Sequence, residues 1–129
     1  MMRYNPEQPP QQQRWQALDE AEQIELVRMW HRKNRIRLPN ERLHAVLHVV
    51  VENQVALGDE TPVAEALERL VEEGLSRHEA LHAIGGVLAA HLLKMHAGGV
   101  PEGEDANLQY FQEVRALTAQ RWRQSAMDL

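Results

Sequence analysis

The sequence predicts an all-α fold, a single-domain bundle of about five helices. Apolar residues recur every three or four positions through most of the chain, which is the spacing of an amphipathic helix. Proline and glycine interrupt this pattern close to residues that commonly cap helices. Only 5% of the 129 residues are aromatic while 43% are hydrophobic, so we expect a core built mainly from leucine, valine, isoleucine and alanine. No strand pattern or internal repeat competes with this interpretation.

The first residues differ in composition from the remainder of the chain. They include three prolines and a run of glutamines, and such a segment buries too little apolar surface to offset the entropy of ordering. We therefore expect residues 1–13 to be a disordered tail. Residues 14–124 are expected to form the helical bundle domain, a length that is ordinary for one domain.

Two long helices are predicted in the first half of the chain. Residues 14–32 carry apolar side chains on one helix face. These are Trp15, Leu18, Ala21, Ile24, Val27 and Trp30. Asn40 is a suitable N-cap for a second helix over residues 41–57, which ends before Gly58. This helix contains a valine triplet, which is typical of strands, but its length and flanking period favour a helix at the centre of the bundle.

The next two helices have well-marked ends. Thr61 as a cap and Pro62 at the first helical position open one helix, and Gly74 ends it. Ser76 and Glu79 form the pattern of a capping box, in which each side chain bonds the backbone N–H of the other residue. This box is expected to open the following helix.

Small residues and a final helix complete the predicted fold. Gly85 and Gly86 lie within the helix that follows the capping box, which indicates close packing against another backbone or a homodimer interface. A glycine-rich loop begins at Gly98. Asp105 or Asn107 then caps a last helix that extends to about residue 124.

Two histidine pairs are the most informative feature of the chain. His44 and His48 are four residues apart, as are His78 and His82. In a helix this spacing puts both imidazoles of a pair on one face, with Cβ atoms roughly 5–6 Å apart. Glu52 continues the first pair by another four residues. Each pair therefore has the spacing of two ligands to one metal ion.

The two pairs are also expected to lie at the same depth in the bundle. Short connections make neighbouring helices antiparallel, so the helices that carry the pairs are expected to run parallel. At about 1.5 Å per residue, His44 and His48 lie about 6 and 12 Å from the start of their helix, and His78 and His82 about 3 and 9 Å from the start of theirs. This agreement predicts one four-histidine cluster.

A metal site is one interpretation of this cluster, and a hydrogen-bonded network is the other. With no cysteine in the chain, zinc or iron would be held by nitrogen and oxygen ligands. The candidate metal ligands are His44, His48, Glu52, His78 and His82. Alternatively, the four rings hydrogen-bond to each other, to neighbouring polar side chains and to buried water, in a non-enzymatic interaction or dimerisation module.

The second pair also forms an HExxH motif, in which two histidines hold zinc and a glutamate acts as general base. Glu79 is the candidate catalytic residue of such a zincin-like metallohydrolase. The extended pattern resembles that of metzincins as far as its glycine, but Leu88 stands where the third histidine is needed and His91 is one turn out of register. Glu79 is also the expected capping partner of Ser76, a role that places it poorly for activating water.

The segment from Leu43 to His91 resembles a group of small uncharacterised bacterial helical proteins, known only as a domain of unknown function. Its shared pattern is H-x-x-x-H, then E-x-Q or E-N-Q, then R-H-[ED]-x-x-H. The resemblance implies a shared site without naming its chemistry. The positions that match the pattern are His44, His48, Glu52, Gln54, Arg77, His78, Glu79 and His82.

Charge and hydropathy restrict the function classes. A formal net charge of -5 argues against general nucleic-acid binding. No apolar stretch is long enough for a membrane helix, and the first residues do not form a signal peptide, so we expect a cytoplasmic protein. The substrate is not indicated. His31, His91 and His96 are interpreted as ordinary surface or boundary residues.

Overall fold

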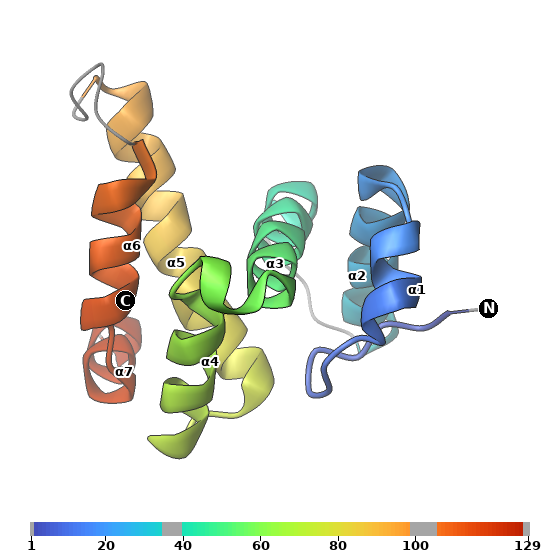
Figure 1. The fold of residues 1–129 in the computed structure, drawn as a ribbon, viewed down its shortest axis with the longest axis horizontal. Helices are drawn as coiled ribbons and strands as arrows, with labels where there is room; N and C mark the ends of the chain where they lie inside the picture. The colour runs from blue at the N-terminus through green and yellow to red at the C-terminus, as the bar shows by residue number, and fades with distance from the viewer. Residues whose placement is uncertain (1, 35–39, 99–105, 128–129) are drawn as a thin grey trace.

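The computed structural model describes residues 2–34, 40–98 and 106–127, and over these residues the protein is all-α (Figure 1). The described elements are α1 (Gln12–Ala17), α2 (Glu20–Lys33), α3 (Glu41–Ala56), the 3-10 turn η1 (Gly58–Glu60), α4 (Val63–Glu72), α5 (Arg77–His96), α6 (Ala106–Ala116) and α7 (Ala119–Met127). No strand occurs in the described ranges, which confirms the all-α part of the prediction. None of the helices in these ranges has the length and apolar character needed to cross a bilayer.

The structure has seven α-helices in the described ranges where about five were predicted, and the first difference is at Asp19. The predicted helix over residues 14–32 is divided into α1 and α2. The Asp19 side chain accepts a hydrogen bond from the Glu22 backbone N–H at 2.8 Å, and the Glu22 side chain accepts one from the Asp19 N–H at 3.1 Å. This capping box begins a new helix, α2, because it satisfies backbone N–H groups that have no partner within the helix. The break was not predicted because the apolar spacing continues across it.

The predicted last helix is also divided, into α6 and α7. Thr118 begins the second part, where its hydroxyl accepts a hydrogen bond from a backbone N–H at 3.1 Å. The Ala119 N–H donates to the Glu73 carboxylate of α4 at 2.8 Å. Arg69, also of α4, donates to carbonyl oxygens at the end of α6, including that of Leu117. These side chains from α4 satisfy the backbone groups that a break in a helix exposes.

Several predicted boundaries are confirmed. The Asn40 side chain accepts a hydrogen bond from the N–H three residues on, at 3.1 Å, and caps α3. Ser76 and Glu79 form the expected capping box at the start of α5. Gly74 follows α4 with a φ of 107°, a conformation in which glycine has no steric penalty. Pro62 is the N-cap of α4 and not its first helical residue.

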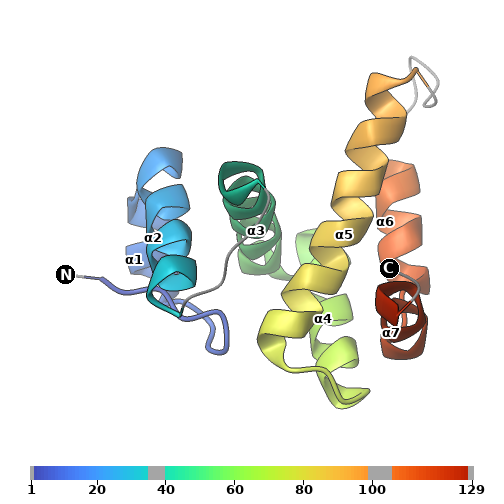
Figure 2. The same ribbon diagram turned by 180° about the vertical axis from the view of Figure 1, so that it is seen from behind.

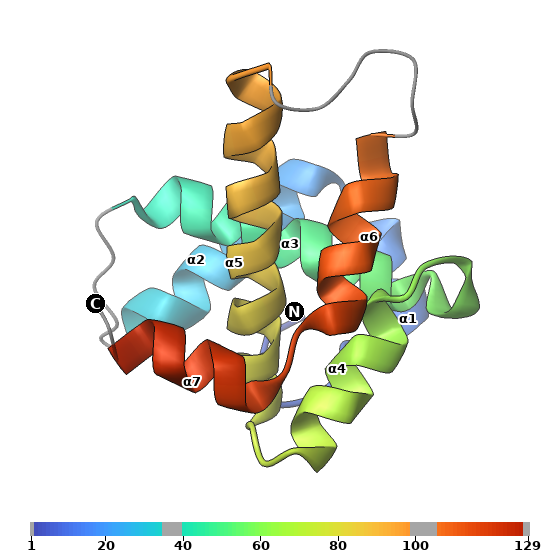
Figure 3. The same cartoon turned by 90° about the vertical axis from the view of Figure 1, so that its left-hand side faces the viewer.

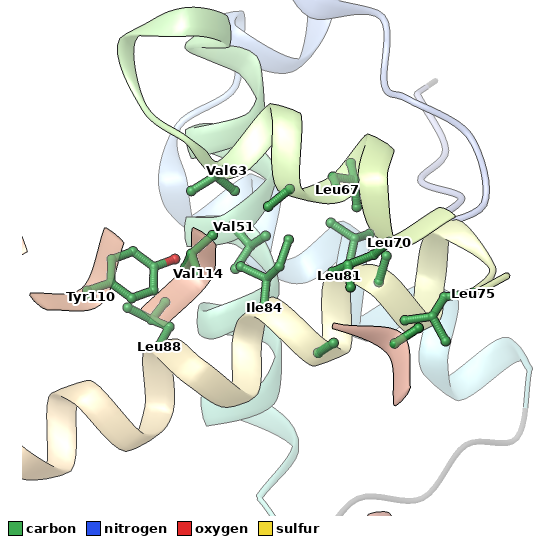
Figure 4. Packing of buried hydrophobic residues seen from close by; sticks show 14 residues of the cluster. Val51, Val63, Leu67, Leu70, Leu75, Leu81, Ile84, Leu88, Tyr110 and Val114 are labelled. Carbon is green, nitrogen blue, oxygen red and sulfur yellow. The ribbon is translucent and has the colours of Figure 1, made fainter. Parts of the chain in front are cut away.

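Helix α3 lies between two apolar cores. Figures 1 and 2 show α1 and α2 on one side of α3 and α4 to α7 on the other. The smaller core consists of Tyr4, Trp15, Ile24, Val27, Ala45 and Val49. The larger core contains Val51, Val63, Leu70, Leu81, Ile84, Leu88, Tyr110 and Val114, among others (Figure 4). Because α3 contributes to both cores, its polar residues between them are held on both sides.

The segment before α1 contacts the helices, in contrast to the expected disordered tail over residues 1–13. The Tyr4 side chain belongs to the smaller core and is 5% exposed. The Pro6 carbonyl accepts a hydrogen bond from the Arg77 guanidinium at 3.0 Å. The Glu7 carboxylate accepts one from the His78 backbone N–H at 2.6 Å. A composition poor in apolar residues failed to indicate this because one tyrosine and two acceptors make the contacts.

Helices α3 and α5 contact each other, but they cross and do not run parallel, so the parallel arrangement predicted for them is wrong. Figure 3 shows α5 crossing in front of α3. The histidine pairs lie in the first half of each helix. They come together because the two helices cross near these halves, not because the pairs are level along a common axis.

Candidate metal centre

Five imidazole rings gather where α2, α3 and α5 meet. They belong to His31 of α2, His44 and His48 of α3, and His78 and His82 of α5. The ring centroids of the two pairs are 4.6 Å apart for His44 and His82 and 5.6 Å apart for His48 and His78. The two predicted pairs therefore lie together in the folded chain.

Four of these residues offer ligand atoms to a common point. The candidate ligand atoms of His31, His48, His78 and His82 all lie within 4.8 Å of one another. Around a tetrahedral ion with metal–nitrogen bonds of about 2.1 Å, the nitrogens are about 3.4 Å apart. Rotations of these side chains that bring the nitrogens closer by about 1.5 Å or less are enough to reach this geometry. The cluster is therefore able to hold a metal ion.

His31 was not among the predicted ligands, and its interpretation as a surface or boundary residue is wrong. It is 1% exposed. Its Nδ1 lies 2.8 Å from the Val27 carbonyl oxygen. A carbonyl only accepts, so Nδ1 carries the proton and the neutral ring has its lone pair on Nε2. The helical spacing of Ile24, Val27 and His31 puts the histidine on the buried face of α2, and this was the signal available in the sequence.

The hydrogen bonds of Tyr4 show which ring nitrogen of His48 carries the proton. The Tyr4 hydroxyl donates to the Glu52 carboxylate at 2.5 Å and lies 2.7 Å from Nε2 of His48. Because the single hydroxyl proton is directed at Glu52, Nε2 of His48 donates to the tyrosine oxygen. The lone pair of the neutral His48 ring is then on Nδ1, a buried atom with no hydrogen-bond partner.

The two histidines of α5 complete the set of unpartnered nitrogens. Nε2 of His78 and Nε2 of His82 are buried and have no hydrogen-bond partner. A buried polar atom without a partner costs about 1–3 kcal/mol. Trp30 covers His78 from the side, with ring centroids 4.8 Å apart. A metal ion at the centre of the cluster would give each of these nitrogens a partner.

Burial keeps the rings of the cluster neutral. Burial and, to a smaller extent, the neighbouring imidazoles together lower the pKa of His44, of His78 and of His82 to about 4 in each case. The same two causes hold the pKa of His48 well below its usual value. Burial also lowers the pKa of His31. A neutral imidazole is the form that binds a metal ion, so the cluster is ready to act as a ligand set near neutral pH.

Glu52 was predicted as a ligand, but the structure does not place it in the group of four. It is 1% exposed, and both of its oxygens are engaged by other residues. The Arg77 guanidinium donates to Oε2 at 2.9 Å and to Oε1 at 2.8 Å, and the Tyr4 hydroxyl donates to Oε2. Glu52 therefore contacts the cluster through Tyr4 and His48, in the position of a carboxylate that would orient a candidate ligand.

His44 was also predicted as a ligand and lies beside the group of four. Its Nε2 is 3.2 Å from Nε2 of His31. Because the lone pair of His31 is on Nε2, His44 donates this hydrogen bond. A metal ion bound to His31 would take that lone pair and leave the His44 N–H free for another acceptor.

Glu79, the candidate general base, is exposed and caps the start of α5. Its Oε1 accepts a hydrogen bond from the Ser76 N–H at 3.0 Å. Leu88, at the position of the missing third histidine, is buried in the larger core. This arrangement offers no additional support for a hydrolytic role of Glu79 beyond the motif itself.

The other predicted features have mixed outcomes. His91 is 2% exposed, so its interpretation as a surface or boundary residue is wrong, whereas His96 is exposed. A Cβ atom added to Gly85 or Gly86 meets nothing within 4 Å. The close packing expected at these glycines is therefore absent within the described part of the chain. Asp105, the alternative cap of the last helix, lies outside the described residues.

No protein-family model matches the chain, and no curated protein or solved structure matches it either. The resemblance to uncharacterised bacterial helical proteins stays a prediction.

Proposed function

We propose that this protein binds one divalent zinc or iron ion through His31, His48, His78 and His82. The observation that carries the proposal is a set of four imidazoles from three helices, two buried and two partly buried, whose candidate ligand atoms lie within 4.8 Å of one another. Three of these nitrogens have no hydrogen-bond partner, and the fourth accepts a hydrogen bond only from His44. Imidazole nitrogen is a suitable ligand for both metals.

Charge near the site is compatible with a cation. His78 is the second residue of α5, where the helix dipole is equivalent to about half a positive charge. The Glu7 carboxylate on the His78 N–H offsets this charge directly. Glu52 supplies a second carboxylate, which is buried and balanced by Arg77. The ion would therefore be held mainly by the nitrogen lone pairs.

Metal analysis of tag-free protein tests the proposal. The full chain, stripped with a chelator and then dialysed against zinc or ferrous iron, is expected to retain one ion per chain. His31→Ala, His48→Ala and His82→Ala should each reduce this content strongly, while His96→Ala, which removes an exposed histidine, should not. Saturation with zinc at about 100 times the dissociation constant should stabilise the fold by about 2.7 kcal/mol.

The competing proposal is a non-enzymatic interaction or dimerisation module whose histidines only support the fold. It predicts metal-free protein whose thermal stability is unchanged by zinc or iron. The hydrolytic alternative requires a further result, in which Glu79→Gln abolishes turnover while the ion is retained. A loss of helix stability alone in Glu79→Gln would indicate the capping role.

A further inference from the structure

A pocket lies beside the metal centre, between α3, α5 and α7. Its volume is about 330 Å³, which is in the range of small-molecule sites. His44, His48 and His82 line it, and Gly85, Gly86 and Trp122 are among the other lining residues. The remaining lining residues are leucine and alanine, and none of the described residues that line the pocket is Asp, Glu, Lys or Arg.

The two glycines leave room that other residues would fill. A Cβ atom at Gly85 or Gly86 would meet no atom within 4 Å. Glycine within a helix is less stable than alanine by about 1 kcal/mol, and no close approach of another helix compensates for this here. The part of the pocket wall that α5 forms at Gly85 and Gly86 therefore has no side chain, and Trp122 of α7 also lines the pocket.

The histidines connect this pocket to the proposed ion. His48 is 3% exposed and its Nδ1 has no hydrogen-bond partner, as is also true of Nε2 of His82. Both residues belong to the group of four ligands and also line the pocket. Zinc can expand from four to five ligands, so a molecule in the pocket can supply the additional ligand.

Charge and hydrogen bonding indicate what this molecule carries. Four neutral imidazoles leave the charge of a divalent ion uncompensated, and the Glu52 carboxylate is paired with Arg77. An anionic oxygen is therefore favoured at the ion. His44 lines the pocket, and binding of the ion to Nε2 of His31 would free the His44 N–H to donate to that oxygen.

We propose that this pocket binds a small carboxylate with an apolar body, whose carboxylate oxygen reaches the metal ion and accepts a hydrogen bond from His44. The apolar body lies along Gly85 and Gly86 against Trp122. This inference rests on the proposed metal binding and adds the chemical class of the ligand.

Benzoate is the test ligand, with acetate and benzamide as comparisons. Calorimetry on the zinc-loaded full chain should show that benzoate binds. The affinity for acetate should be lower by about tenfold or more, because acetate lacks the apolar ring. Benzamide, which has the ring without the charge, should also bind more weakly. In cobalt-loaded protein, benzoate should change the visible absorption spectrum of the ion.

Gly85→Leu tests the pocket without weakening the helix, because leucine is a better helix former than glycine. We expect it to retain one zinc ion and to lower benzoate affinity by about tenfold or more, since the added side chain occupies the space of the ligand. Ala90→Leu is the matched control on the exposed face of α5 and should change neither value. His44→Leu should keep the ion and weaken benzoate by about fivefold.

The outcomes separate the two proposals. Wild-type protein that binds zinc but not benzoate, or Gly85→Leu that binds benzoate like the wild type, overturns the pocket proposal and leaves the metal site in place. Wild-type protein that fails to retain zinc overturns the proposed function, and this inference with it.

Discussion

Acidification of the metal-free protein should destabilise the fold through the histidine cluster. In the folded state the pKa values of His44, His78 and His82 are each about 4, because the rings are buried close together. In the unfolded chain a histidine has a pKa of about 6.5. Between these values the unfolded chain binds more protons, so the free energy of unfolding falls as the pH falls through this window.

The size of the effect follows from these pKa values. For one histidine with these two pKa values, moving from about pH 7.5 to about pH 5.5 lowers the free energy of unfolding by about 1.3 kcal/mol. Three independent histidines would lower it by about 4 kcal/mol. Because the rings interact and are partly solvated, we expect about 2–4 kcal/mol for the set.

Urea denaturation with chelator present, followed by circular dichroism at both pH values, measures this effect. His82→Leu should reduce the difference between the two pH values by about 1 kcal/mol, because it removes one of the titrating rings. His96→Asn removes an exposed histidine and should leave the difference as it is in the wild type.

Equal unfolding free energies at both pH values would refute the argument. That result would mean that the rings can take up protons in the folded protein as easily as in the unfolded chain. The cluster would then lack the buried neutral imidazoles on which metal binding depends.

Three further perturbations test separate parts of the structure. Tyr4→Phe should cost about 1–3 kcal/mol in urea denaturation and weaken zinc by about 10–100-fold in chelator competition; unchanged zinc affinity would contradict the protonation assigned to His48. Arg77→Met should cost about 3–5 kcal/mol, because it leaves the Glu52 carboxylate buried without its counter-charge. Adding Glu52→Gln should recover part of that loss, and purely additive losses would argue against the pair. Ile84→Ala should cost about 2–5 kcal/mol yet keep one zinc ion per chain, and a folded variant without zinc would show that the core and the site are not separate.

Helix boundaries were predictable where a side chain caps its own helix. Asn40 and the pair of Ser76 and Glu79 are examples, because donor and acceptor are three residues apart. The same chemistry at Asp19 was overlooked, since apolar spacing continues across the break. The break before Ala119 was harder to predict, because the groups that satisfy its backbone are on α4.

The candidate site was also predictable where it depends on residues within one helix. The pairs in α3 and α5 could be recognised because a helix puts residues four apart on one face. His31 has no such partner within α2, and only its place on the apolar face of that helix indicated burial. Tyr4 gave no signal, because it lies in a polar, proline-rich segment and its partners are more than 40 residues away in the chain.

The sequence by itself determined the helical class, the faces on which the paired histidines lie and the absence of cysteine ligands. These depend on interactions within one turn of helix or on composition. Tertiary structure decided which rings share a centre, which nitrogen of His31 and His48 carries the proton, and that Glu52 pairs with Arg77. The physical reason is that the protonation and burial of a side chain depend on the groups around it, and here those groups come from segments that only folding brings together.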